Sequence, residues 1–221
     1  MAKLFVVATP IGNLKDITLR ALDILKEVDF VLAEDTRVAK KLLEHFGIKK
    51  EVISYHQHSG PDKMDYILGL FREGKNLALV SDSGTPGISD PGARLVAESL
   101  KNDIEVIPVP GPSAVIAAAS IAGFPMDKFI FMGFPPAKNK RNKFFERLKR
   151  SDYPVIIYES PHRVLKTLQE LSGVKSEIVV CREITKKFET ICRGTAEDIV
   201  GKLKEYPIKG EFVIIINNEK D

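Results

Sequence analysis

The chain has 221 residues, of which 44% are hydrophobic, and its formal net charge is +3 at pH 7. This length and composition allow one large core or two modest ones, which excludes a disordered chain and a small disulfide-stapled fold. The two cysteines, Cys181 and Cys192, match neither a zinc knuckle nor a C-x-x-C pair, and no signal segment or membrane-length apolar run occurs. We therefore expect a cytoplasmic protein with reduced thiols.

The first half of the chain alternates strand-like and helix-like segments. Residues 3–8 form an apolar run typical of a strand buried on both faces, and residues 17–28 carry apolar side chains at helical spacing. The alternation continues with strands at 30–33, 52–55, 77–80 and 105–109, and with helices at 38–46, 64–71, 93–100 and 113–122. This pattern predicts an α/β fold with a mainly parallel sheet covered by helices on both faces.

The pattern changes after Phe124. Strand-like segments lie at 129–134, 155–158, 177–182, 189–192 and 212–216, and helix-like segments lie at 140–148, 163–171 and 196–203. Two strands with no helix between them, around residues 183–189, predict antiparallel pairing. We expect two α/β domains, residues 1–124 and 125–221, with a cleft between them. Their net charges are −2 and +5, so a polyanion would be attracted mainly by the second domain.

Three segments rich in glycine and proline, residues 9–13, 81–92 and 110–114, each follow a predicted strand. Ligands of open α/β sheets bind at the carboxyl ends of the strands, so three such loops form a candidate site. None matches a phosphate-binding pattern, and proline-rich backbone suits a rigid wall against adenosine and a sulfonium. Turn-forming residues are also ordinary at strand ends in any fold.

These loops belong to a longer set of motifs. The strings are VATPIGNLKDITLRAL at 7–22, AEDTR at 33–37, SDSGTPGISDPG at 81–92, PVPGPSA at 108–114, YESPHR at 158–163, CREITKKFET at 181–190 and GEFVIII at 210–216. Together they resemble the bacterial methyltransferases that act on a cytidine 2′-hydroxyl in small-subunit ribosomal RNA, within the tetrapyrrole methylase superfamily. The resemblance covers nearly the whole chain.

The resemblance implies two α/β domains of the tetrapyrrole methylase type, with the methyl donor S-adenosyl-L-methionine in the interdomain cleft, and usually a homodimer. The implied substrate is a cytidine ribose in small-subunit (16S) ribosomal RNA, either as RNA or in the assembled subunit. By motif position, the residues implied at the donor are Pro10, Asp82, Gly84, Thr85, Ile88, Ser113, Ala114 and Tyr158.

Methylation of a ribose hydroxyl requires an oriented oxygen and an acceptor for its proton. Asp35 in AEDTR is the first candidate for the general base, with Arg37 able to pair with it or with a substrate phosphate. Glu159 and Arg163 in YESPHR are the second candidate pair. Each could equally be a structural ion pair or a helix cap, which is a common role for Asp before a helix.

Residues 138–150, KNKRNKFFERLKR, contain seven basic residues and one acidic residue. Phe144, Phe145 and Leu148 fall on one helical face and are expected to pack inward, which leaves the basic side chains for RNA phosphates or simply for solvent. The residues predicted to bind RNA are Lys138, Lys140, Arg141, Lys143 and Arg147. The four histidines form no metal-binding pattern, so no metal is expected.

Two other functions stay open. The chain could be another member of the superfamily, acting on a porphyrin-type ring or on a modified amino acid in a protein. It could also be a non-catalytic RNA-binding or ribosome-assembly factor built on a methyltransferase fold. AEDTR, YESPHR and the long SDSGTPGISDPG string favour the ribosomal branch, and the intact donor loops argue against a non-catalytic role.

Overall fold

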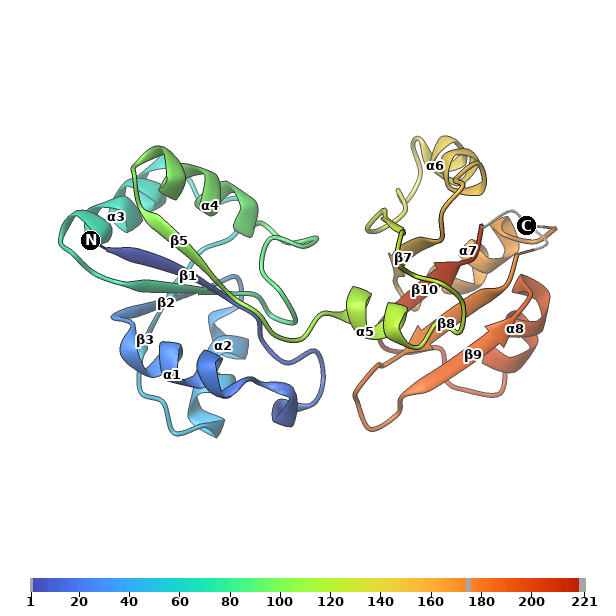
Figure 1. The fold of residues 1–221 in the computed structure, drawn as a ribbon, viewed down its shortest axis with the longest axis horizontal. Helices are drawn as coiled ribbons and strands as arrows, with labels where there is room; N and C mark the ends of the chain where they lie inside the picture. Colours follow the sequence, from blue (N-terminus) through green and yellow to red (C-terminus); the bar gives the residue numbers. More distant parts are fainter. Residues whose placement is uncertain (1, 174–175, 219–221) are drawn as a thin grey trace. The chain divides into compact units, whose positions relative to one another are not determined.

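The structure is a computed structural model that describes residues 2–173 and 176–218. The chain divides into two compact units, residues 1–113 and 114–221, and each is built on its own five-stranded sheet (Figure 1). The division falls earlier in the chain than the boundary expected near Phe124. The physical reason is that helix α5 (Ala114–Ser120) packs on the second sheet through its buried Val115, Ala118 and Ala119.

The first unit is a doubly wound sheet whose strands all run parallel, in the order β3-β2-β4-β1-β5. Its elements are β1 (Lys3–Val7), a 3₁₀ turn (Leu14–Asp16), α1 (Leu19–Glu27), β2 (Phe30–Ala33), α2 (Thr36–His45), β3 (Glu51–Ser54), α3 (Pro61–Arg72), β4 (Leu77–Val80), α4 (Gly92–Lys101) and β5 (Glu105–Val109). The predicted parallel sheet with alternating helices is confirmed, with small shifts at the ends of elements.

Strand β4 shows how one short apolar run serves two cores. Successive strand residues point to opposite faces of the sheet. Leu77 and Leu79 pack with residues of α3 and α4 on one face, whereas Ala78 and Val80 pack with residues of α1 and α2 on the other. All four are buried, which is why the strand is apolar throughout.

The second unit has a mixed sheet in the order β6-β7-β10-β8-β9. After α5 its elements are β6 (Ile130–Phe131), α6 (Arg141–Lys149), β7 (Val155–Glu159), α7 (Val164–Glu170), β8 (Ile178–Arg182), β9 (Thr190–Gly194), α8 (Ala196–Leu203) and β10 (Phe212–Ile216). β8 and β9 are antiparallel, as predicted, and β10 is antiparallel to both β7 and β8. Residues of α6, α7 and α8 pack on one face of this sheet, and those of α5 on the other.

Both cysteines lie in this second sheet. Cys181 and Cys192 are free and buried, as expected for reduced thiols. Burial raises the pKa of the Cys181 thiol to about 11, so the thiol stays protonated at neutral pH and is a poor nucleophile.

Candidate functional site

Three loops meet at the carboxyl edge of the first sheet, because the strands that precede them are neighbours in the order β4-β1-β5. Thr9, just beyond β1, forms a bridge with Gly84, beyond β4, through two backbone hydrogen bonds of 2.9 and 3.1 Å. The Thr85 hydroxyl donates over 3.2 Å to the carbonyl of Pro112 in the loop after β5. The prediction that these three loops form one cluster is confirmed.

The loop after β4 is held in one conformation by its own polar groups. The Asp90 carboxylate accepts hydrogen bonds of 2.7 Å from the backbone N–H groups of Gly87 and Gly92. The Ser81 hydroxyl donates over 3.0 Å to the carbonyl of Gly84. Gly84 has a φ of +80°, a left-handed value that residues with side chains rarely adopt. A loop ordered in this way loses little conformational entropy when a ligand binds.

Replacing Gly84 with alanine is expected to lower the free energy of unfolding by about 1–2 kcal/mol, because a side chain is strained in the left-handed region. The added methyl group would also lie 3.3 Å from Ile11 Cγ2. Urea denaturation measures the change. Gly69→Ala, inside α3 and with open space around the new methyl group, is the matched control and should not destabilise the protein. Equal stability of the two variants would contradict strain at Gly84.

The residues that the resemblance assigns to the methyl donor fall in both units. In the first unit, the structure places Pro10, Asp82, Gly84, Thr85, Ile88 and Ser113 within the three clustered loops. In the second unit, Ala114 and Tyr158 pack against the same apolar cluster. Burial raises the pKa of Tyr158, although the nearby backbone N–H of Val115 acts in the opposite direction. The Tyr158 side chain is therefore neutral at physiological pH.

Asp35 follows β2 and caps helix α2, which was one of its two expected roles. Its carboxylate accepts 2.8 Å from the backbone N–H of Arg37 and 2.6 Å from the Arg37 guanidinium. These bonds hold the pKa of Asp35 well below its usual range. The backbone N–H of Asp35 donates over 3.1 Å to the Asp82 carboxylate, because β2 and β4 are neighbours. The structure thus brings the candidate base beside a residue assigned to the donor.

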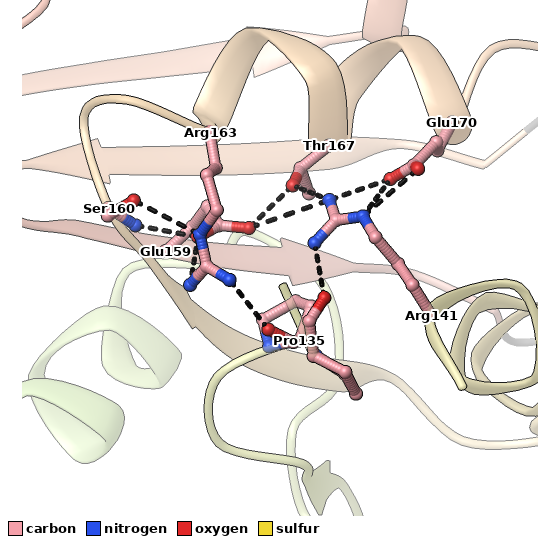
Figure 2. Close-up of polar contacts among 8 residues, drawn as sticks. Pro135, Arg141, Glu159, Ser160, Arg163, Thr167 and Glu170 are labelled. Carbon is pink, nitrogen blue, oxygen red and sulfur yellow. Dashed lines mark hydrogen bonds and ion pairs between the residues drawn. The ribbon is translucent and has the colours of Figure 1, made fainter. Parts of the chain in front are cut away.

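Glu159, the last residue of β7, has a fully buried side chain surrounded by hydrogen-bond donors (Figure 2). Its Oε1 atom accepts 2.8 Å from the backbone N–H of Ser160 and lies 2.8 Å from the Arg163 guanidinium. Its Oε2 atom accepts 2.6 Å from the Thr167 hydroxyl and lies 3.8 Å from Arg141 Nη2. A buried carboxylate persists when it is paired in this way. These contacts favour the structural ion pair that the sequence left open for Glu159 and Arg163.

Arg141, at the start of α6, points into this cluster, and its side chain is only 4% exposed. Its guanidinium lies 2.7 Å from a Glu170 carboxylate oxygen and donates over 2.7 Å to the Thr167 hydroxyl. The prediction that Arg141 faces outward toward RNA is wrong. The physical reason is helical spacing, since Arg141 shares one face of α6 with the buried Phe145 and Leu148.

The rest of the basic segment is arranged as expected. Phe145 and Leu148 are buried, and Phe144 is packed against the same core. The four remaining residues predicted to bind RNA are all exposed: Lys138, Lys140, Lys143 and Arg147.

Thr167 and Glu170 complete the buried cluster, although no motif in the sequence singles them out. The sequence does place them by spacing, because Arg163, Thr167 and Glu170 recur at helical intervals and so lie on one face of α7. That spacing alone does not show that the face meets a buried carboxylate and an arginine of α6. The cluster is therefore a tertiary feature.

Within residues 2–173 and 176–218, no three His, Cys, Asp or Glu side chains lie close enough together to hold a metal ion. Over the same part of the chain, no helix is long and apolar enough to cross a membrane.

The sequence matches the family model of tetrapyrrole (corrin/porphyrin) methylases over residues 3–200. The chain is also similar to proteins named ribosomal RNA small subunit methyltransferase I. The one from Halalkalibacterium halodurans is 45% identical, over 98% of this chain and 77% of that protein. The one from Synechocystis sp. is 46% identical, over 98% and 79%. The one from Thermotoga maritima is 41% identical, over 100% of both.

Solved structures of other methyltransferases share the fold. A cobalt precorrin-4 methyltransferase matches with a TM-score of 0.73 and 22% identity, covering 99% of this chain and 96% of that one. The methyltransferase CobJ matches with a TM-score of 0.70 and 20% identity, covering 99% and 95%. At these identities the likeness establishes the architecture alone.

Proposed function

This chain belongs to the tetrapyrrole methylase family and is a methyltransferase, and from that premise we propose that it transfers a methyl group from S-adenosyl-L-methionine to a cytidine 2′-hydroxyl in small-subunit ribosomal RNA. The observation that carries the proposal is similarity along the whole chain. Relatives named for methylation of small-subunit ribosomal RNA are 41% to 46% identical over at least 98% of it. The choice of a cytidine ribose rests on the motif resemblance.

The clustered loops of the first unit fit such a donor. Their surface combines glycine and proline backbone with Ile88, which is 46% exposed, and with the exposed Asp82 carboxylate. Apolar and backbone surfaces suit adenosine, and a carboxylate suits a positively charged sulfonium. S-adenosyl-L-methionine supplies an electrophilic methyl group when bound. The residues proposed to hold it are Pro10, Asp82, Gly84, Thr85, Ile88, Ser113, Ala114 and Tyr158.

The protein itself must orient the ribose oxygen and accept its proton. Orientation can lower a barrier by about 7–11 kcal/mol, so binding geometry is expected to provide most of the acceleration. Asp35 is the proposed base, and its lowered pKa keeps it ionised at neutral pH. The Arg37 side chain is 85% exposed, so it is free to turn toward a substrate phosphate. Such a turn would remove its bonds to Asp35 and raise the basicity of the carboxylate.

A labelling experiment tests the reaction. The purified protein is incubated with tritium-labelled S-adenosyl-L-methionine and small ribosomal subunits from cells that lack the endogenous enzyme, and the RNA is then digested to nucleosides. Label is expected in 2′-O-methylcytidine. Label in another nucleoside or in a ribosomal protein would contradict the proposed substrate. If the donor binds in calorimetry and no label is transferred, the acceptor is a different molecule, and absence of both would favour the non-catalytic role.

The exposed basic residues around α6 are proposed to contact RNA phosphates. Changing Lys143 and Arg147 together to alanine is expected to weaken RNA binding and to reduce the slope of log K against log salt concentration by about 1.4–1.8, because each phosphate contact contributes about 0.7–0.9. Filter binding at several salt concentrations measures this slope. The matched control changes Lys26 and Lys204 to alanine, two exposed lysines outside α6. The same loss of slope in the control would contradict a specific role for α6.

Two further parts of the proposal rest on the family resemblance and on the substrate. A homodimer is the assembly expected from the resemblance. A ribosomal substrate implies that the protein works in the cytoplasm.

A further inference from the structure

Two arginines hold the loop that leads from β6 to α6. Arg163 donates over 2.9 Å to the carbonyl of Pro135, and Arg141 donates over 3.0 Å to the carbonyl of Pro136. The buried Glu159 carboxylate pairs with the Arg163 guanidinium at 2.8 Å and lies 3.8 Å from that of Arg141, which also pairs with Glu170 at 2.7 Å (Figure 2). The proline rings further restrict the backbone. The loop is therefore held in one conformation by the second unit itself.

This loop presents Phe134 to solvent. Phe134 is 53% exposed, although Pro135 beside it is buried. Its ring centroid lies 5.4 Å from that of Tyr158, which in turn packs edge-on against Phe131 at 4.9 Å. The backbone N–H of Tyr158 donates over 3.0 Å to the carbonyl of Gly133 at the base of the loop. Burying charged groups is costly. A buried ion cluster that holds an exposed aromatic ring in place therefore indicates that the ring has a binding role.

We infer that Phe134 stacks on an unpaired base of the RNA substrate, an inference that rests on the proposed function. Exposed Lys138 and Lys140 follow in the same loop, and Lys143 and Arg147 lie on the helix after it. An aromatic ring for a base beside cations for phosphates is the combination by which proteins bind single-stranded nucleic acid. Because the loop is already ordered, little conformational entropy is lost on binding.

Phe188, in the turn between β8 and β9, supplies a matched control. It is 64% exposed and also belongs to the second unit. Lys187 Nζ lies 5.5 Å from its ring centroid and covers one face of the ring. A base could not stack on that face without displacing the lysine. A substitution of Phe188 therefore makes the same chemical change as the substitution of Phe134, at an exposed phenylalanine where we do not expect a base to stack.

The kinetic test compares Phe134→Leu with Phe188→Leu, using small ribosomal subunits as the methyl acceptor. Phe134→Leu is expected to raise KM for the subunits about 5- to 150-fold and to leave KM for S-adenosyl-L-methionine unchanged. Phe134→Tyr, which keeps an aromatic face, is expected to restore most of the loss. Phe188→Leu should behave like the wild type. A rise in KM for the donor instead would assign Phe134 to the donor and overturn the inference.

A fluorescence test is independent of catalysis. The chain has no tryptophan, so Phe134→Trp introduces a single reporter, with Phe188→Trp as its control. Titration with single-stranded oligocytidylate is expected to quench the indole emission of the Phe134→Trp variant and not that of the Phe188→Trp variant. The effect of S-adenosyl-L-methionine alone is measured first and subtracted, because the Phe134 ring lies 5.4 Å from that of Tyr158, one of the residues proposed to hold the donor. If the oligonucleotide quenches the emission but the protein transfers no label to RNA, base stacking is supported and the proposed methylation is contradicted. Wild-type-like kinetics of Phe134→Leu together with unquenched emission of Phe134→Trp would overturn the inference and leave the proposed methylation intact.

Discussion

Replacing Glu159 with alanine is expected to lower the free energy of unfolding by about 3–5 kcal/mol, the usual cost of removing one partner from a buried ion cluster. The change leaves the 4% exposed Arg141 and the partly buried Arg163 without the carboxylate between them. It also leaves the Thr167 hydroxyl without its 2.6 Å acceptor. Urea denaturation followed by circular dichroism measures the loss.

Glu170→Ala is the matched control, because Glu170 also pairs with Arg141 but its side chain is 25% exposed. Water can then solvate part of the freed charge, so a smaller loss is expected. A loss at Glu159 no larger than that at Glu170 would contradict a structural role for the buried carboxylate. Glu159→Gln tests the alternative that Glu159 is the general base. A Glu159→Gln variant that folds and binds both substrates but has a strongly reduced kcat would support that alternative.

Replacing Asp35 with asparagine is expected to lower kcat about 10²- to 10⁴-fold, the usual contribution of a general base. Asparagine caps a helix about as well as aspartate, so α2 should keep its N-terminus while the charge and the proton acceptor are lost. Single-turnover methylation of small subunits at saturating donor measures the chemical step. Unchanged kcat in a folded Asp35→Asn variant would leave Asp35 as a cap alone.

The pH dependence of stability gives a second measurement on Asp35. Its folded pKa lies below the ordinary value of 3.8, because Arg37 hydrogen-bonds the ionised form. The pair therefore stabilises the folded state above that pH, and the contribution is lost as the pH falls through the folded pKa. Asp35→Asn should remove this part of the acid sensitivity. Arg37→Ala should remove only the share due to the guanidinium, because the backbone N–H of residue 37 still donates to the carboxylate. An unchanged acid transition in both variants would contradict the pairing.

Local patterns were sufficient for the secondary structure and for the clustering of the donor loops. β2, β4, β5 and β10 have the predicted bounds, because short apolar runs flanked by turn residues are distinctive of strands. The strand expected at 129–134 is shorter, at Ile130–Phe131, because Gly133 takes a φ of +65° and Pro135 follows. The loops after β1, β4 and β5 meet because parallel strands end at the same edge of their sheet.

The sequence by itself determined the alternating α/β pattern, the parallel first sheet, the antiparallel pair β8 and β9, the three clustered loops and the family, since each is written in local periodicity or in contiguous motifs. It did not determine the pairing of β10 with β7 and β8. Only the tertiary structure decided which charged side chains are buried and which are exposed. Arg141 and Lys143 are both cations of one helix, yet the first is buried against Glu159 and Glu170 while the second is exposed. That difference depends on which face of α6 meets α7 and β7, and a carboxylate that is far away in the sequence supplies the partner that makes burial of the charge possible.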